Sequence, residues 1–348
     1  MSPPRARDYP APVAIPAIVV AGDRRAAKAV YGESKVYLQL GGRPLVAHVV
    51  AALQQVPEVA EVWVVGNAER LREVFGAPGV ARSLAKPLRV VPQFRSLYEN
   101  GWQTYRRLLP GAGPDGRDPL PEDLDREVLF LSGDLPFAAP QEISAFVRQA
   151  RDAGCSYALG LATEESLRGF AARSPGEPGI EPALFNLREG RFRQTNLHLI
   201  RPARIENRFY IEEMYEHRYQ REWGHAAALA WRLLWSEQGG LSVLSYYALM
   251  HLAAIAHRRR LHRLADAIRH RIPTARIERG VSGLLRAAFR LVVTEAGGCA
   301  IDIDTEPEYD AARQRYAEWR AAQEERALRL YGPPGLPAGS AAVGESAR

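Results

Sequence analysis

The chain has 348 residues, of which 47% are hydrophobic and 25% charged, and its net charge is +6. This composition is ordinary for a globular protein and excludes a chain too polar to form a core. The positive charge favours anionic ligands, but arginine-rich composition also arises from genome bias, and we expect no nucleic acid as partner. The two cysteines, Cys155 and Cys299, are far apart, which predicts reduced thiols in a cytoplasmic protein rather than a disulfide framework or a zinc site.

No stretch of the sequence predicts a secretion signal or a membrane-spanning helix. Residues 1–14 are polar and rich in proline, and we expect them to form a disordered extension. The longest apolar run, 241–256, falls short of the roughly 20 residues needed to span a bilayer. It also contains two serines and a histidine, and it therefore predicts a buried helix.

Short apolar runs alternate with helical patterns over the first half of the chain. Runs rich in valine, isoleucine and leucine predict strands at 15–22, 62–66, 88–91, 128–132 and 157–161. Helices are expected at 45–53, 69–75, 96–109 and 141–150, with a surface loop rich in proline and glycine at 110–126. This alternation predicts a three-layer αβα sandwich with a mostly parallel, mixed sheet.

The second half changes to a helical texture, which we interpret as an insertion at about 205–285 within one domain of residues 15–332. Its main helices are expected at 212–235 and 241–270, and Pro273 ends the second. The elements expected after the insertion are a strand at 289–293, another at 300–305, a charged helix at 308–330 and a disordered tail at 333–348.

Three candidate positions follow apolar strands, namely Gly22, Asn67 and Asp134. Ligands of open α/β sheets bind outside the carboxyl ends of the strands. A carboxylate at this edge can hold a divalent cation beside nucleotide phosphates, which makes Asp134 the strongest candidate. The alternative is a turn aspartate, because Gly-Asp-x-Pro is also favourable turn chemistry.

Asp302 and Asp304 alternate along the expected strand at 300–305, and they should therefore point to opposite faces. Only one of them should reach the same metal as Asp134, while the other caps or orients. Thr305 and Glu308 have the spacing of a capping box, which predicts the start of the terminal helix.

Four cations surround the end of the first strand at Gly22: Arg24, Arg25, Lys28 and Lys35. Because glycine has no Cβ, a ligand can approach the backbone closely there. We interpret this opening as a place for a phosphate-bearing nucleotide. The chain has no P-loop pattern, and no Gly-x-Gly-x-x-Gly follows this strand, which weighs against an NAD enzyme.

Together these motifs resemble the nucleotidyltransferases of the molybdenum-cofactor guanylyltransferase-like type. The amino-terminal part of the resemblance consists of Val-Val-Ala-Gly at 19–22, Lys35, Gly-Arg-Pro-Leu at 42–45 and the helix at 48–53. It continues with Gly-Asp-Leu-Pro-Phe at 133–137, Gln-Thr-Asn-Leu at 194–197 and Asp-Ile-Asp-Thr-Glu-Pro-Glu-Tyr at 302–309. The motifs follow one another in family order across most of residues 15–320.

The resemblance implies a glycosyltransferase-A-like fold, similar to that of the nucleotide-diphospho-sugar transferases. It also implies a magnesium-dependent reaction in which a phosphorylated cofactor, sugar or polyol attacks the α-phosphorus of a nucleoside triphosphate. The triphosphate would be GTP or CTP, and pyrophosphate would be released.

The resemblance further implies a role for each matching residue. Asp134 and Asp304, with Asp302 as the alternative, would hold magnesium. Lys35, with Arg24 or Lys28, would stabilise charge on the triphosphate and the departing pyrophosphate. The residues expected to contact the nucleotide are Ala21, Gly22, Asn67, Glu99, Asn100 and Asp134. Those expected to contact the acceptor are Thr195 and Asn196.

Two departures from the family pattern leave alternatives open. The loop at 22–28 is poor in glycine, and the late motif reads Glu-Pro-Glu-Tyr at 306–309 where the family has Pro-Glu-Asp-Leu. Which of the loop cations binds the triphosphate therefore stays open. The rival functions are a glycosyltransferase, with Asp302-Ile303-Asp304 as its metal motif, and a non-catalytic nucleotide-binding module.

The segment at 257–271 is strongly basic, with only Asp266 opposing. Three interpretations compete: a solvated helix face, an acceptor site for an anionic substrate, and a peripheral contact with a membrane surface. The sequence leaves the oligomeric state open.

Overall fold

The structure of the chain, a computed structural model, describes residues 13–23, 29–208, 210–211 and 261–334, and the single residues 249, 252, 255, 256 and 259. The expected amino-terminal extension and carboxyl-terminal tail lie almost wholly outside these residues. So do the expected helix at 212–235, half of the expected helix at 241–270, and the residues Arg24, Arg25 and Lys28.

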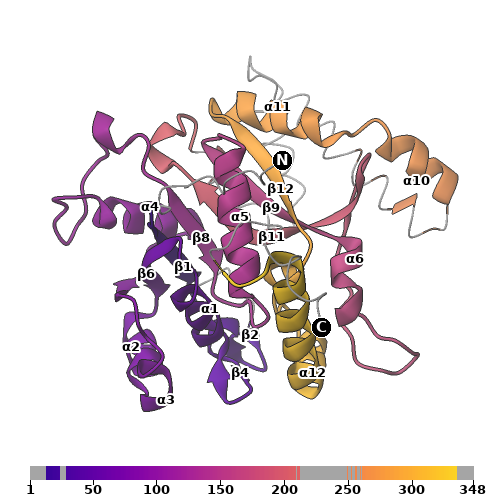
Figure 1. Ribbon diagram of the computed structural model, residues 1–348, viewed down its shortest axis with the longest axis horizontal. Coiled ribbons are helices and arrows are strands. Elements are labelled where there is room, and N and C mark those ends of the chain that lie inside the picture. The colour runs from indigo at the N-terminus through magenta and orange to yellow at the C-terminus, as the bar shows by residue number, and fades with distance from the viewer. Residues whose placement is uncertain are drawn as a thin grey trace, which may run out of the picture.

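A mixed sheet forms the centre of the described chain (Figure 1). Its strands are β1 (Ile15–Ala21), β6 (Val59–Gly66), β7 (Leu88–Pro92), β8 (Val128–Ser132), β9 (Tyr157–Thr163), β10 (Phe185–Leu187), β11 (Gly190–Ile200) and β12 (Phe289–Thr294). They follow the spatial order β12-β9-β11-β8-β1-β6-β7, with β10 beside β11. β11 is antiparallel to β8 and β9, and the remaining pairs along this path are parallel.

Helices and short hairpins connect these strands. The helices are α1 (Leu45–Gln54), α2 (Ala68–Gly76), α3 (Pro78–Ala81), α4 (Leu97–Leu108), α5 (Pro140–Asp152), α6 (Glu164–Leu167), α10 (His262–Arg269), α11 (Thr274–Leu285) and α12 (Glu306–Tyr331). Between β1 and α1 the chain forms two hairpins, β2 (Ala29–Val30) with β3 (Glu33–Ser34) and β4 (Gln39–Leu40) with β5 (Arg43–Pro44). A 3₁₀ turn at Lys35–Tyr37 joins the two hairpins.

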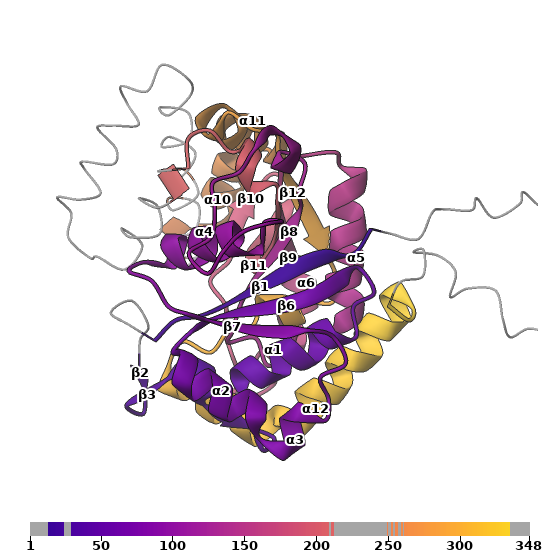
Figure 2. The ribbon, with the colours of Figure 1, turned by 90° about the vertical axis from the view of Figure 1, so that its left-hand side faces the viewer.

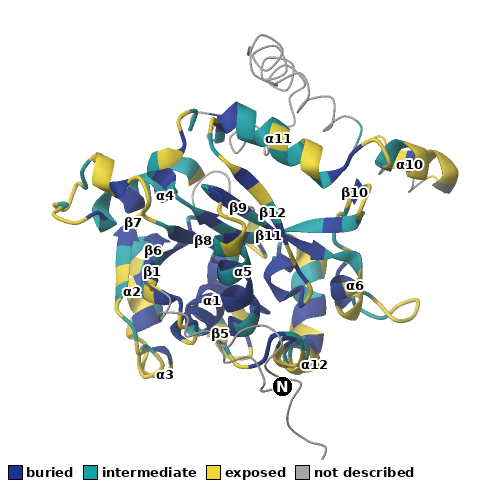
Figure 3. Ribbon diagram, turned by 45° about the horizontal axis from the view of Figure 1, so that its top comes forward, coloured by how far each residue is buried: buried dark blue, intermediate teal, exposed yellow. Residues whose placement is uncertain are grey.

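Helices cover both faces of the sheet, which buries the strands (Figures 2 and 3). Successive residues of β1 show the two layers. Ala17 and Val19 belong to a core shared with α1 and α5, whereas Ile18 packs in a second core with Tyr105 of α4. Because each face of the strand is covered, a continuous apolar run is the pattern that the sequence needs there. The three-layer αβα arrangement predicted from the sequence is confirmed.

The expected elements of the first half are confirmed with small changes at their ends; β6, for example, begins at Val59 rather than residue 62. The long antiparallel strand β11 was not expected from the sequence, whereas the helix α11 lies within the helical insertion expected at 205–285. Cys155 and Cys299 are free thiols, as predicted, and both are buried. Within the described part of the chain, no helix is both long and apolar enough to cross a membrane.

The expected strand at 300–305 is wrong, because residues 301–304 are in no strand. β12 already occupies the end of the sheet, next to β9. After it the chain turns at Gly298–Ala300, where the buried carboxylate of Glu142 accepts the N–H groups of Gly297 and Cys299 at 3.0 and 3.1 Å. The segment that carries Asp302 and Asp304 is therefore free of the alternation that a strand imposes.

Gly66 ends β6 at a place where the sheet leaves no room for a side chain. A Cβ there would lie 2.4 Å from the carbonyl oxygen of Ala21. We expect Gly66→Ala to destabilise the protein by about 2–3 kcal/mol, because backbone of β1 would have to move. Chemical denaturation measures the loss. Gly76→Ala, where the added Cβ meets no atom within 4 Å, is the control and should change stability by less than about 1 kcal/mol. Equal losses in the two variants would contradict the prediction.

His48 on α1 links the second hairpin to α12. Its Nε2 is 2.9 Å from the carbonyl oxygen of Leu40, and its Nδ1 is 3.2 Å from the hydroxyl of Tyr316. Burial lowers the pKa of His48 below its ordinary value of 6.5. The unfolded chain therefore takes up this proton at higher pH than the folded one, and stability is lost as the pH falls from about 6.5 towards the folded-state pKa.

We expect urea unfolding between pH 8 and pH 5 to show this loss in the wild type, and His48→Gln to reduce its pH dependence. The two proteins are compared at each pH, so that contributions from the other histidines cancel. Identical slopes would show that His48 does not contribute.

Candidate functional site

Three carboxylates meet at the carboxyl edge of the sheet. Asp134 follows β8 directly, where the N–H of Gly133 donates to the carbonyl oxygen of Val20 at 2.9 Å and continues the pairing with β1. Asp302 and Asp304 come from the segment between β12 and α12. One oxygen from each of the three carboxylates lies within 4.8 Å of the other two. Carboxylate oxygens are the hard donors that divalent cations such as Mg²⁺ and Ca²⁺ prefer.

The expectation that Asp302 and Asp304 point to opposite faces, so that only one of them comes to the metal position beside Asp134, is wrong in its geometry. Both lie beside Asp134, because residues 301–304 are not extended in a sheet. The capping prediction holds beside it: Thr305 accepts the N–H of Glu308 at 3.4 Å, and Glu308 accepts the N–H of Asp304 at 2.9 Å. The start of α12 thus fixes the backbone of Asp304.

Lys35 lies between two of the three carboxylates. Its Nζ is 2.8 Å from Asp134 Oδ2 and 2.5 Å from Asp304 Oδ1. Burial alone would lower the pKa of Lys35, but the negative charges of Asp134 and Asp304 outweigh burial and raise the pKa above its ordinary value. The lysine is therefore charged at neutral pH and neutralises part of the acidic cluster. Of the predicted cations, it is the one that the described residues include.

Arg193 on β11 holds the third carboxylate, with its Nη2 at 2.5 Å from Asp302 Oδ1. Burial, and then the charge of Asp134, raises the pKa of Asp302 despite this partner. Arg193 was not predicted from the sequence. The signal was its place two residues before Thr195, within the strand that carries the expected acceptor residues.

The end of β1 is joined to the loop after β7. The side chain of Gln93 accepts the N–H of Asp23 at 3.0 Å and donates to Asp23 Oδ1 at 2.6 Å. Asn100 is buried and accepts the N–H of Phe94 at 2.6 Å. A Cβ on Gly22 would lie 3.0 Å from the amide nitrogen of Asn100, which places that side chain beside the strand end. The structure therefore brings Asn100 to Gly22, together with Gln93, which was not predicted.

Asn67 and Glu99 have structural partners of their own. Asn67 caps α2 by accepting the N–H of Arg70 at 3.3 Å, and its amide nitrogen is 3.4 Å from Asp23 Oδ2. Glu99 accepts the N–H of Arg95 at 3.0 Å and pairs with the Arg95 guanidinium at 3.1 Å. Asn67 follows the carboxyl end of β6 and Glu99 lies in the first turn of α4, both as expected from the sequence, and each already has these partners.

The expected acceptor residues lie where β11 bulges. Its pairing with β9 shifts register between Gln194 and His198, and Thr195 and Asn196 lie inside this irregularity. Thr195 is fully buried and accepts the N–H of Leu197 at 3.3 Å. Asn196 is partly exposed and immediately precedes Leu197, which pairs with Leu131 of β8. The bulge therefore brings Asn196 near the strand end that leads to Asp134.

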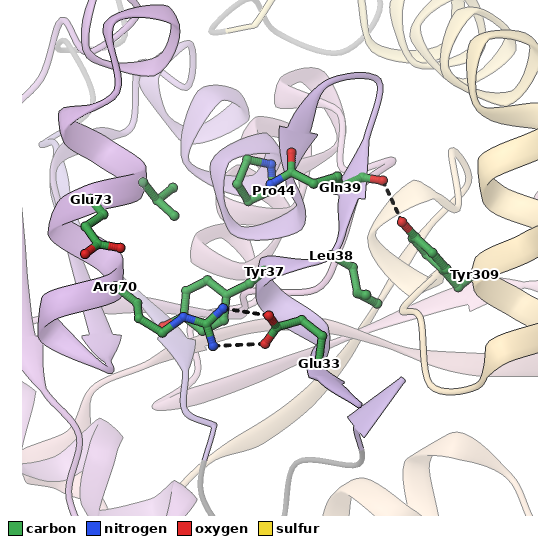
Figure 4. Close-up of a pocket in the computed structure, with 9 residues that line it drawn as sticks. Glu33, Tyr37, Leu38, Gln39, Pro44, Arg70, Glu73 and Tyr309 are labelled. Carbon is green, nitrogen blue, oxygen red and sulfur yellow. Dashed lines mark hydrogen bonds and ion pairs between the residues drawn. The ribbon is translucent and has the colours of Figure 1, made fainter. Parts of the chain in front are cut away.

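A pocket of about 410 Å³ lies between the β2–β3 hairpin, α2 and the start of α12 (Figure 4). None of the predicted site residues lines it. Its polar groups contact one another, since Arg70 pairs with Glu33, and the Tyr309 hydroxyl donates to the carbonyl oxygen of Gln39 at 2.9 Å. Asp134, Asp304 and Lys35 thus meet outside this pocket.

Two predicted features lie wholly or partly outside the described residues. Arg24 and Lys28 lie outside the described residues, although Asp23 and Ala29 on either side of them are described. Of the basic segment, residue 259 and residues 261–271 are described, and within α10 Arg269 pairs with Asp266 at 3.0 Å. The three interpretations of this segment stay open.

Comparison with known proteins finds one matching protein family and a distant curated relative. The family described as MobA-like NTP transferase domain matches residues 17–271. A 2-C-methyl-D-erythritol 4-phosphate cytidylyltransferase of Chlorobium luteolum is 25% identical over 123 residues, which are 35% of this chain and 48% of that protein. The match thus spans about half the length of this curated relative.

A solved structure, a hypothetical transferase from Thermus thermophilus, is 21% identical, with a TM-score of 0.55 over 85% of this chain and 99% of its own. The likeness shows a shared fold.

Proposed function

Because this chain belongs to the family of MobA-like NTP transferase domains, we propose that it is a magnesium-dependent nucleotidyltransferase. It would transfer a nucleoside monophosphate from a nucleoside triphosphate to a phosphorylated acceptor and release pyrophosphate. The observation that carries this proposal is the meeting of Asp134, Asp302 and Asp304 with Lys35 at the carboxyl edge of the sheet.

The proposed step needs positioning and charge neutralisation more than an acid–base pair. An oxygen of the acceptor phosphate forms a bond to the α-phosphorus while the bond to the pyrophosphate oxygen breaks, and pyrophosphate leaves with the electron pair. Lys35 is charged and well placed to stabilise the negative charge that collects on the leaving group. Arg24 or Lys28, from the adjoining loop, is proposed to share this role.

Asp134 and Asp304, with Asp302 beside them, are the residues that would hold magnesium. The ion would neutralise phosphate charge and orient the reacting oxygens. Lys35 pairs with the same carboxylates, and this supports the proposal because buried carboxylates require a positive partner. Arg193 neutralises Asp302, and we propose that it also faces the acceptor phosphate, since it lies on the strand of Thr195 and Asn196.

The nucleotide is proposed to lie over Ala21 and Gly22, at the end of β1, with Asn100 and Gln93 beside it. CTP is the first triphosphate to test and a polyol phosphate the first acceptor, because the curated relative is by name a cytidylyltransferase for 2-C-methyl-D-erythritol 4-phosphate. GTP is the second. The free, buried thiols support the cytoplasmic location that we propose.

The experiment is a thermal-shift panel of ATP, GTP, CTP and UTP with Mg²⁺, followed by pyrophosphate release in the presence of phosphorylated acceptors. We expect one pyrimidine or guanine triphosphate to stabilise the protein and to be turned over with a phosphorylated acceptor. Turnover of nucleotide sugars alone would instead establish the glycosyltransferase. Binding without pyrophosphate release, unchanged in Asp134→Ala, would establish a non-catalytic module.

A further inference from the structure

We propose that Arg70, on α2, is a positioning residue that holds Lys35 in its place between Asp134 and Asp304. The role as stated rests on the proposed function, in which Lys35 contacts the triphosphate. Arg70 itself touches none of the three carboxylates in the cluster, and acts through the backbone of the segment that carries Lys35.

Arg70 contacts the chain on both sides of Lys35. Two residues before it, Glu33 receives two parallel hydrogen bonds, from Arg70 Nη1 to Oε1 at 2.9 Å and from Nη2 to Oε2 at 2.8 Å. Two residues after it, the ring of Tyr37 lies under the guanidinium, with its centroid 3.8 Å from Arg70 Cζ. Figure 4 shows Arg70 stacked on Tyr37 with both of its bonds to Glu33.

Two further hydrogen bonds hold the backbone of the segment between these two contacts. Glu33 also accepts the N–H of Ser34 at 2.7 Å, and the carbonyl oxygen of Lys35 accepts the N–H of Leu38 at 3.0 Å in the 3₁₀ turn. The four-carbon stem of a lysine has a limited reach, and so its amine can lie between both carboxylates only while the backbone of residue 35 stays at the right distance from them. The contacts of Arg70 on either side would keep the backbone at that distance.

Arg70 is itself placed by the site. Asn67, which caps α2, also contacts Asp23 at the end of β1. The helix that carries Arg70, α2, therefore begins at the same sheet edge as the carboxylates. Through Asn67 and Arg70, this one helix connects the end of β1 to the segment that carries Lys35. On the opposite side of the hairpin, the Tyr31 hydroxyl donates to Asp310 Oδ2 of α12 at 2.6 Å. The hairpin is thus held between α2 and the helix that follows Asp304.

Stability alone does not explain this arrangement. The side chains of Arg70 and Glu33 are 37% and 41% exposed, and ion pairs exposed to this degree contribute little to folding. A direct contact of Arg70 with phosphate is also disfavoured, because both terminal nitrogens are bonded to Glu33. What the bidentate, stacked geometry provides is a fixed orientation.

The first test is a double-mutant cycle on pyrophosphate release with Arg70→Met and Lys35→Met. We expect Arg70→Met to lower kcat about 10-fold with little change in the KM for the triphosphate, and to cost less than about 2-fold in the Lys35→Met background. Arg70→Lys, which keeps the charge but not the fork, should fall in between. An equal loss in both backgrounds, or an unchanged kcat, would overturn the proposal.

The second test needs no catalytic activity. The rate at which an amine-reactive succinimidyl ester modifies Lys35 is followed by mass spectrometry in the metal-free protein. We expect Arg70→Met and Glu33→Gln each to raise this rate about 5-fold, because Lys35 leaves the two carboxylates more often. Arg72→Met is the matched control: Arg72 is exposed on the same helix, and the described part of the chain offers it no ion pair, so the rate should not change.

The two tests separate the two claims. If no triphosphate supports pyrophosphate release, the proposed function fails, and the modification rates still decide whether Arg70 holds Lys35. If wild type and Arg70→Met are modified at the same rate while both melt cooperatively, the positioning role is refuted whatever the activity.

Discussion

Replacing Asp134 with asparagine should lower pyrophosphate release by about 10²–10³-fold, the loss seen when one group that stabilises a charged transition state is removed. The substitution preserves the size of the side chain and removes its charge. Asp134 is 5% exposed and belongs both to the carboxylate cluster and to the pair with Lys35. Its loss would weaken the proposed magnesium site and leave Lys35 with one partner.

The measurement is kcat/KM with the triphosphate and acceptor identified in the panel. Asp152→Asn is the matched control, because Asp152 is an exposed carboxylate at the end of α5. The activity of this variant should equal that of the wild type. Activity of Asp134→Asn within about 3-fold of the control would refute the assignment of Asp134 to the reaction, given that removal of an essential transition-state contact costs far more.

Replacing Lys35 with methionine should lower both the activity and the stability of the metal-free protein, and it should increase the stabilisation by magnesium. Activity should fall by about 10²-fold, because the triphosphate and leaving pyrophosphate lose a fixed positive charge. The metal-free protein should lose about 2 kcal/mol of stability, since Asp134 and Asp304 lose the cation that lies between them.

Magnesium should restore more stability to Lys35→Met than to the wild type. In the wild type the ion would have to share its carboxylates with the lysine, whereas in the variant they have no competing cation. Thermal unfolding with and without Mg²⁺ measures both effects, and Lys35→Arg, which keeps the charge, should respond as the wild type does. An equal or smaller magnesium shift in Lys35→Met would contradict a metal site at these carboxylates.

The local physical chemistry of the sequence determines most of the central sheet and its covering helices. The apolar run Ile15–Ala21 had to be a strand covered on both faces, because its β-branched residues leave no polar side for solvent. Asp134 could be identified for a similar reason: a parallel strand ends at Ser132, and its carboxyl end is where ligands gather. The capping pair Thr305 and Glu308 likewise marked the start of α12.

Three features of the site were outside the reach of such local signals. Asp302 and Asp304 meet Asp134 together because β12 fills the end of the sheet and releases the segment after it. Arg193 reaches Asp302 across 109 positions in the chain, on a strand whose antiparallel direction no local pattern revealed. Arg70 reaches Glu33 and Tyr37 because α2 begins beside the end of β1.

The sequence by itself therefore determined the strands and helices of the first half of the chain, the family, and most of the residue types of the candidate site. Only the tertiary structure decided which of these residues meet, and which cations hold them. The physical reason is that strand and helix patterns arise from neighbours within a few positions, whereas charged groups are paired by the packing of distant segments. Lys35 and Asp304 are separated by 269 positions in the chain, yet the Nζ of the lysine lies 2.5 Å from Oδ1 of the aspartate.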